Sequence, residues 1–252
     1  MKKFLFADLD DTLFQTAHKC DPALEAQLEP IAYYQDGSIC SYTTHAQREF
    51  LAMASREMVL IPTTARDLDA LRRVDLPFKS YAIANFGGMI VKPDGSLDLE
   101  WMQHMQQALA PAQALFPALM EMLENYLGQQ AWGARARIVH DEGIHFYALV
   151  KETERNAPHL AAMAEEVLRP WLAHQGQQFY LHRNANNLAI LPKVLNKTYA
   201  VRQVQTYLRQ TYGHILSIGM GDSHSDASFL AACDYAMMPS QSQLAKTALE
   251  LA

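Results

Sequence analysis

Three aspartates follow a short apolar run near the start of this 252-residue chain, in the stretch FLFADLDDTLF over residues 4–14. Asp8, Asp10 and Asp11 stand so close together that their carboxylates repel one another unless a positive charge compensates them. Burying them without a partner would also be costly. A bound cation is the simplest compensation, and carboxylate oxygens are ligands that Mg²⁺ accepts.

Other polar clusters come directly after apolar runs further along the chain. TTARD, which contains Thr64, follows MVLIP; MGDSHSD, which contains Asp222 and Asp226, follows ILSIG; and SQSQ follows YAMMP. Continuous apolar runs of this length are typical of buried parallel strands. Because ligands of such sheets bind outside the carboxyl ends of the strands, we expect these clusters to converge on one crevice.

Helical patterns alternate with these apolar runs. They cover residues 45–57, 196–212, 224–232 and 241–251, and Lys197 in PKVLNK stands near the start of the second. Alternating strands and helices predict an α/β fold, with a doubly wound, Rossmann-like core built on a parallel sheet.

The middle of the chain has a different pattern. After MIVKP and a PDG turn comes a long helical stretch to Tyr126, in which Pro111 and Pro117 predict a break. ARARIVH and IHFYALVK flank DEG as in a hairpin, and a helix over 154–174 and the strands QQFYLHR and NLAIL follow. We predict an inserted α+β cap domain over residues 85–187, and a core formed by residues 1–84 and 188–252.

The segment 15–45 is longer than a connection between a strand and a helix requires. It contains IAYYQDGSICSY, whose Asp-Gly pair predicts a hairpin turn. Two interpretations remain open: an enlarged flap over the crevice, or a surface hairpin without a catalytic part.

The order of these motifs resembles that of the haloacid dehalogenase superfamily of phosphatases and phosphotransferases. That superfamily has DxDxT, a Ser or Thr, a Lys and GDxxxD, which match residues 8–12, Thr64, Lys197 and residues 221–226. The position of the inserted module is similar to a type II, subtype B cap. Such caps occur in sucrose phosphatases, mannosyl-3-phosphoglycerate phosphatases, phosphomannomutases and Cof-like sugar phosphatases.

The resemblance implies a role for each core residue. Asp8 would be the nucleophile and form an aspartyl-phosphate. Asp10 would be the general acid and base, with Thr12 fixing its orientation. Thr64 and Lys197 would contact the phosphoryl oxygens, and Asp226 would orient Lys197 or a metal-bound water. The Mg²⁺ ligands would be Asp8, the backbone carbonyl of Asp10, and Asp222.

Several further polar residues are candidate substrate contacts: Arg66, Asn85, His182, Arg183 and Asn187. Arg66 could instead pair with Asp67 or Asp69. The asparagine-rich stretch around residues 184–187 could equally be an ordinary turn.

Composition and charge exclude several classes of protein. A net charge of −6 and a pI near 5.9 give no basic field that would attract nucleic acid or an acidic membrane surface. No apolar run approaches the ~20 residues that span a bilayer. The three cysteines lack a CxxC spacing, so we expect reduced thiols in a cytoplasmic protein.

Taken together, the sequence predicts an Mg²⁺-dependent phosphatase that hydrolyses a small phosphorylated metabolite, with a sugar phosphate as the favoured substrate. Two alternatives remain: a phosphotransferase or phosphomutase of the same superfamily, and a non-catalytic sensor of phosphorylated ligands. The sequence makes no prediction of the oligomeric state.

Overall fold

The computed structural model describes residues 1–130, 132–153, 157–175, 178–184 and 186–249. The chain forms two compact units. Unit 1 comprises Met1–Met102 and Asn196–Ala252, and unit 2 comprises Gln103–Leu195. Helix α3 (Leu99–Gln113) begins in the first unit and continues into the second.

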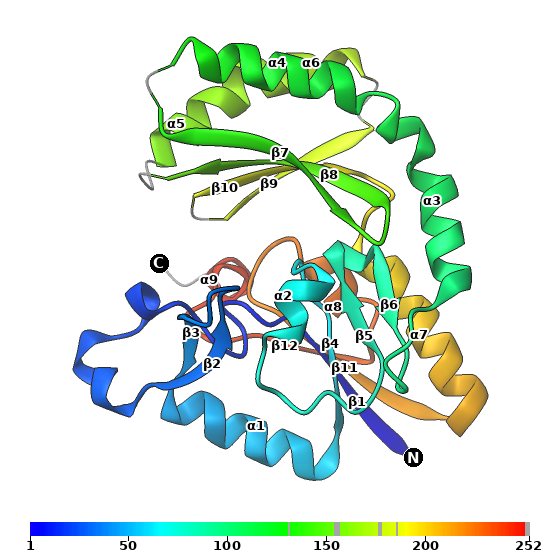
Figure 1. The fold of residues 1–252 in the computed structure, drawn as a ribbon. Coiled ribbons are helices and arrows are strands. Elements are labelled where there is room, and N and C mark those ends of the chain that lie inside the picture. Colours follow the sequence, from blue (N-terminus) through cyan, green and yellow to red (C-terminus); the bar gives the residue numbers. More distant parts are fainter. Residues whose placement is uncertain (131, 154–156, 176–177, 185, 250–252) are drawn as a thin grey trace. The chain divides into compact units, whose positions relative to one another are not determined.

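Unit 1 is built on a four-stranded parallel sheet (Figure 1). The strand order is β12-β11-β1-β4, with bounds β1 Lys2–Ala7, β4 Val59–Pro62, β11 Ile215–Met220 and β12 Tyr235–Met237. In the central strand, Phe4, Leu5 and Phe6 are almost completely buried. Both faces of this strand are therefore covered, which is why its sequence shows no alternation of apolar and polar residues. The predicted α/β class and its parallel core are confirmed.

The helices of unit 1 have the bounds α1 His45–Glu57, α2 Leu68–Arg72, α7 Lys197–Tyr212, α8 Ala227–Leu230 and α9 Gln243–Ala248. Four of them, α1, α7, α8 and α9, fall close to the predicted ranges, and the short helix α2 was not predicted. Helix α1 begins with a capping box in which Thr44 and Gln47 satisfy each other's backbone N–H groups. The last helix ends before the predicted residue 251, and residues 250–251 lie outside the described part of the chain.

Two hairpins complete unit 1. Strands β2 (Glu29–Tyr33) and β3 (Ile39–Thr43) form the predicted Asp-Gly hairpin, with Gly37 at φ +81°. They follow two short 3₁₀-helices, η1 (Ala17–Lys19) and η2 (Pro22–Gln27). The second hairpin joins β5 (Ala82–Ala84) and β6 (Met89–Val91) through η3 (Asn85–Gly87). Whether the first hairpin acts as a flap stays a prediction.

The hairpin of β5 and β6 belongs to unit 1, although residues 85–91 fall within the predicted cap. A parallel bridge between Thr63 and Ile83 attaches it to the edge of the sheet beyond β4. Gly87, at φ +95°, lies against the chain before α7: a Cβ at this position would stand 2.6 Å from the backbone oxygen of Asn196. Glycine is therefore required both by the backbone conformation and by the close approach.

Unit 2 is an α+β module, and its sheet has the order β7-β8-β10-β9 with antiparallel pairing (Figure 1). The bounds are α4 Phe116–Gly128, β7 Ala134–Asp141, β8 Ile144–Glu152, α5 Ala157–Met163, the π-helical η4 Ala164–Leu168, α6 Arg169–His174, β9 Phe179–Asn184 and β10 Asn187–Pro192. The predicted break near Pro111 and Pro117 is confirmed, because α3 ends at Gln113 and α4 begins at Phe116.

The helices of unit 2 pack on one face of its sheet. Phe116, Leu119 and Leu123 of α4 form a buried cluster with Val150 of β8 and Leu188 of β10. Because Leu188 lies in this cluster, β10 is part of unit 2 rather than of the predicted core. The predicted starts of a helix at 154 and of a strand at 177 lie outside the described residues. Among those described, no helix combines the length and apolar character needed to cross a membrane.

Candidate active site

The carboxyl end of β1 places Asp8 beside the carboxyl end of β11. Asp8 donates its backbone N–H to the carbonyl oxygen of Met220 at 2.8 Å, which continues the parallel ladder by one residue. The Asp8 side chain is therefore next to the loop that contains Asp222 and Asp226, and the residue is only 6% exposed. The predicted convergence of two strand ends follows directly from this pairing.

Lys197 is the cationic centre of the site. Its Nζ lies 2.6 Å from Asp8 Oδ1 and 2.7 Å from Asp226 Oδ1, and all three side chains are buried. Lys197 is the first residue of α7, where the helix dipole disfavours a positive charge. The two carboxylates offset this cost, and they raise the pKa of Lys197 although burial alone would lower it. Asp226 thus contacts Lys197, one of the two groups it was expected to orient, and its role toward a metal-bound water stays a prediction.

Asp226 is held by its own loop. Its Oδ2 accepts hydrogen bonds from the backbone N–H of Ser223 at 3.1 Å and from the Ser223 hydroxyl at 2.7 Å. A Cβ at position 221 would stand 2.6 Å from the Cβ of Asp226, so Gly221 leaves room for this side chain. Sequence reasoning missed Ser223. Its position three residues before Asp226, in a polar turn, is the signal that could have identified it.

The predicted contact of Thr12 with Asp10 is wrong. The Thr12 hydroxyl lies 3.3 Å from Asp8 Oδ2 and 3.2 Å from Asp222 Oδ1. Thr12 thus connects the acidic loop after β1 with the acidic loop after β11. Asp10 binds Arg66 instead. The next residue, Asp11, adopts φ +64° and pairs with Lys19 of the segment 15–45.

Negative charge exceeds positive charge at this site. One oxygen from each of Asp8, Asp222 and Asp226 lies within 4.8 Å of the others, and Lys197 supplies one compensating charge. Burial, followed by the charges of Asp226 and Asp11, raises the pKa of Asp222 to about 6. Burial also raises the pKa of Asp8 well above its usual value. An excess of two negative charges on oxygen donors fits a divalent cation such as Mg²⁺.

The raised pKa of Asp222 leads to a testable pH dependence. Mg²⁺ binding requires the ionised carboxylate, so below pH 6 the metal must displace a proton. We expect Mg²⁺ to raise the Tm at pH 7.5 by several degrees, since about 100 Kd of a ligand contributes about 2.7 kcal/mol. At pH 5 the apparent Kd should be roughly tenfold weaker. Thermal denaturation across an Mg²⁺ titration at both pH values measures this.

Asp222→Ala is the matched variant for this measurement. It should weaken the effect of Mg²⁺ on the Tm, and a wild-type Mg²⁺ dependence would show that Asp222 is not a ligand. In metal-free buffer, the ionisation of Asp222 should make the folded state less stable as the pH rises, whereas a salt-bridged acid makes it more stable. The contribution of Asp222 to stability is present below pH 3.8 and is lost as the pH rises through about 6, because the folded state holds its proton more tightly.

Thr64 and Arg66 lie in the loop that follows the carboxyl end of β4. Thr64 follows β4 and is 1% exposed, and its Oγ1 accepts the backbone N–H of Arg66 at 3.1 Å. Arg66 does not pair with Asp67 or Asp69: its guanidinium binds Asp10. Asp67 caps α2, and Asp69 pairs with Arg73.

Asn85 is fully buried in η3 at φ +51°, directly after β5. Phe86, at φ +55°, continues this left-handed turn. Non-glycine residues adopt such backbone angles at a cost of about 1–3 kcal/mol, which the surrounding structure must offset. The proposed contact of Asn85 with substrate stays a prediction.

The remaining candidate residues lie in unit 2, on β9 and β10. Ala189 pairs with His182 and Asn187 pairs with Asn184, so His182 and Asn187 share one face of the sheet. Arg183 lies on the opposite face, the one on which the helices pack, and is exposed near the end of β9. The strand geometry therefore separates Arg183 from the other two residues. Their role toward a substrate stays a prediction.

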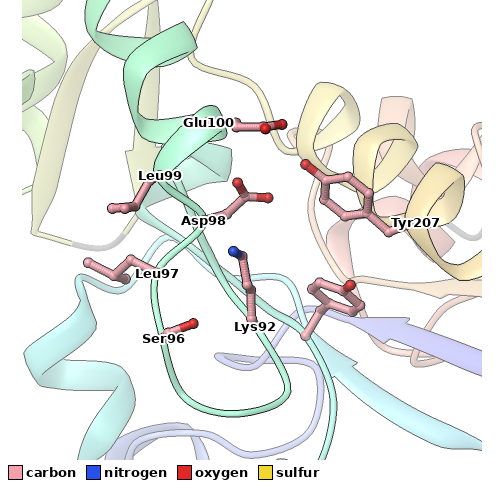
Figure 2. Close-up of a pocket in the computed structure, with 8 residues that line it drawn as sticks. Lys92, Ser96, Leu97, Asp98, Leu99, Glu100 and Tyr207 are labelled. Atoms are coloured by element: carbon pink, nitrogen blue, oxygen red, sulfur yellow. The ribbon is translucent and has the colours of Figure 1, made fainter.

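Unit 1 also contains an open hollow of about 830 Å³ (Figure 2). Its walls are Tyr81, Lys92, Ser96, Leu97, Asp98, Leu99, Glu100 and Tyr207. The rings of Tyr81 and Tyr207 stack at a centroid distance of 5.7 Å. No residue of the predicted site lines this hollow, so it is distinct from the cluster around Asp8.

Comparisons with known proteins identify the fold. No sequence-family profile and no curated protein sequence matches the chain. Among solved structures, the sucrose-phosphatase of Synechocystis, in complex with sucrose and phosphate, is 18% identical with a TM-score of 0.53. The alignment covers 96% of this chain and 85% of that one.

Two further structures extend the likeness. The C-terminal domain of a C. albicans trehalose-6-phosphate phosphatase is 14% identical, with a TM-score of 0.55 and coverage of 92% of this chain and 73% of that one. The IMP-nucleotidase of Plasmodium falciparum is 12% identical, with a TM-score of 0.58 and coverage of 99% and 67%. The chain therefore shares its fold with these three proteins, and the predicted fold class is confirmed.

Proposed function

We propose that this protein is an Mg²⁺-dependent phosphatase that hydrolyses a small phosphorylated metabolite, and that its preferred substrates are sugar phosphates. The observation that supports the proposal is the pair of buried ion pairs that Lys197 forms with Asp8 and Asp226, with Asp222 close by. A nucleophilic carboxylate fixed against an ammonium group, with an excess of acidic oxygens for a divalent cation, is suited to phosphoryl transfer.

In this proposal Asp8 attacks phosphorus through one carboxylate oxygen and forms an aspartyl-phosphate, while Asp10 gives a proton to the leaving alcohol oxygen. Asp10 then takes a proton from the water that attacks the aspartyl-phosphate, and phosphate is released. Lys197 and Thr64 contact the phosphoryl oxygens. Asp8, the backbone carbonyl of Asp10, and Asp222 would hold Mg²⁺, which when bound neutralises the charge of the phosphate and of the clustered acids.

The proposed substrate class rests on proteins that share this fold and on the residues of unit 2. Sucrose-phosphatase and trehalose-6-phosphate phosphatase share this fold, but so does an IMP-nucleotidase. Unit 2, as an inserted cap, would select the substrate, and the hydrogen-bonding groups of His182 and Asn187 suit a hydroxyl-rich ligand. A cytoplasmic location stays a prediction.

A phosphate-release screen with purified protein and Mg²⁺ tests the proposal. We expect sugar phosphates to have the highest kcat/KM in a panel that also contains nucleotides, pyridoxal phosphate, phosphoserine and phosphopeptides. EDTA should stop the reaction, and Ca²⁺ should restore it poorly because its larger, looser coordination shell misplaces the reacting groups. A nucleotide or phosphopeptide as the best substrate would overturn the class.

The same screen separates the alternative functions. Transfer of phosphate to added sugars, in place of free phosphate, would identify a phosphotransferase or mutase. Absence of turnover with every compound, together with saturable binding of one of them, would identify a sensor.

A further inference from the structure

The guanidinium group of Arg66 binds both carboxylate oxygens of Asp10. Its Nε lies 2.7 Å from Oδ2 and its Nη2 lies 2.8 Å from Oδ1. This two-point, charge-assisted geometry fixes the direction of a carboxylate as well as its position, which a single hydrogen bond does not. The Asp10 side chain is 37% exposed, so packing around it restrains it less than the buried Asp8 is restrained.

Arg66 is itself firmly held. Its side chain is only 12% exposed, and its guanidinium lies over the ring of Phe14, 5.2 Å from the centroid. Nη1 donates to the carbonyl oxygen of Ala70 at 3.4 Å. The backbone of Arg66 is fixed as well, because its N–H donates to Thr64 Oγ1 and its carbonyl oxygen accepts from Asn85. A rigid support of this kind can set the direction of the group that it binds.

We propose that Arg66 is a positioning residue for Asp10 and that it acts on the proton-transfer step through this carboxylate rather than by contacting the substrate. The inference rests on the proposed function, in which Asp10 protonates the leaving oxygen. Arg66 then matters in proportion to the need of a substrate for that proton. If Arg66 acted only in substrate binding or in general stability, the effect of removing it would not depend on how much the leaving group needs a proton.

Two aryl phosphates measure this dependence. Phenyl phosphate and p-nitrophenyl phosphate present the same ring, but p-nitrophenolate departs much more readily without a proton. The parameter to compare is kcat/KM, because it reports the steps up to the first irreversible one and so leaves out the later attack of water. The readout is the ratio of kcat/KM for p-nitrophenyl phosphate to that for phenyl phosphate.

In Arg66→Gln we expect this ratio to rise about tenfold, part of the roughly 10²–10⁴-fold that general acid catalysis contributes. Arg66→Lys keeps the positive charge but loses the two-point contact with the Asp10 carboxylate, so it should also raise the ratio. Asp10→Asn should raise it as well. In the double variant Asp10→Asn/Arg66→Gln the ratio should rise no further than in Asp10→Asn alone, because the two residues act as one unit.

Arg73→Gln is the matched control. Arg73 is the C-cap residue of α2, and it pairs with Asp69 and donates to the Tyr33 carbonyl oxygen. Its removal should leave the ratio unchanged, and the Tm of each variant shows whether it is folded. Should Arg66→Gln fail to fold, Arg66→Lys carries the test.

Each outcome decides a different statement. A wild type that releases no phosphate from these two compounds, or from any compound of the metabolite panel, overturns the proposed function and this inference with it. An active wild type whose ratio is unchanged in both Arg66 variants overturns the inference alone. A further rise in the double variant would also overturn it, because Arg66 would then act on something other than Asp10.

Discussion

Asp8→Asn is expected to reduce phosphate release to below about one per cent of the wild-type rate, because an amide cannot form the acyl-phosphate. The substitution also removes one oxygen donor from the cluster of acids that would hold Mg²⁺. Asparagine has nearly the same shape and can still accept a hydrogen bond from Lys197, so the fold should persist. Steady-state phosphate release at saturating Mg²⁺ measures the loss.

The control for this variant is Asp94→Asn. Asp94 is an exposed turn residue whose Oδ1 accepts from the backbone N–H of Ser96, a contact that asparagine preserves. Its activity should match wild type. The Tm of Asp8→Asn should stay within a few degrees of wild type, since the variant neutralises one of several mutually repelling carboxylates. Activity above about one per cent in a folded Asp8→Asn protein would exclude Asp8 as the nucleophile.

Lys197→Ala is expected to act on both rate and stability. The loss of a preorganised contact to the phosphoryl group should lower turnover by roughly 10²-fold or more. The variant also leaves Asp8 and Asp226 buried side by side without their cation. Breaking a buried pair in this way costs about 3–5 kcal/mol, so the free energy of unfolding should fall by that order at neutral pH.

Lys193→Ala separates the effect of the site from that of losing a lysine. Lys193 is exposed and four residues earlier in the chain. Its removal should change neither turnover nor unfolding free energy, which urea titration measures. A wild-type rate in Lys197→Ala would show that another residue supplies the positive charge. An unchanged unfolding free energy would show that the carboxylates are compensated in some other way.

The sequence could predict those site residues whose position depends only on their place just after a strand. Asp8, Thr64 and Asp222 each lie within two residues of the end of a strand, and parallel strands bring such positions to one edge. Strand polarity alone is enough for this prediction. The same reasoning located β1, β4 and β11, because strands that are largely buried leave a continuous apolar signal. β12 was located from its apolar run as well, although Tyr235 and Ala236 are exposed.

The partners of Thr12 and Arg66 could not be predicted in this way. Each partner depends on which side of a tight turn a side chain leaves, and that depends on a backbone feature such as the positive φ of Asp11. Local residue types do not determine it. Thr12 therefore bridges Asp8 and Asp222, whereas Asp10, two positions away from Thr12, meets an arginine that follows a different strand.

The boundary between the units was misplaced for a related reason. A short antiparallel hairpin such as β5–β6 contains no signal that assigns it to either neighbour. Its attachment depends on the bridge from Ile83 to Thr63 and on the approach of Gly87 to Asn196, and both involve residues distant in the chain. Contacts of that range are visible only in the folded molecule.

The pairing of β1 with both β4 and β11 also constrains how the chain can fold as it leaves the ribosome. β1 can meet β4 early, but its other neighbour is synthesised only after the whole of Gln103–Leu195. Until then the Asp8 carboxylate has neither Lys197 nor the loop of Asp222 beside it. Unit 2 is complete in sequence before unit 1, so the nascent chain must keep β1 from pairing with a wrong edge while its permanent neighbour is still being made.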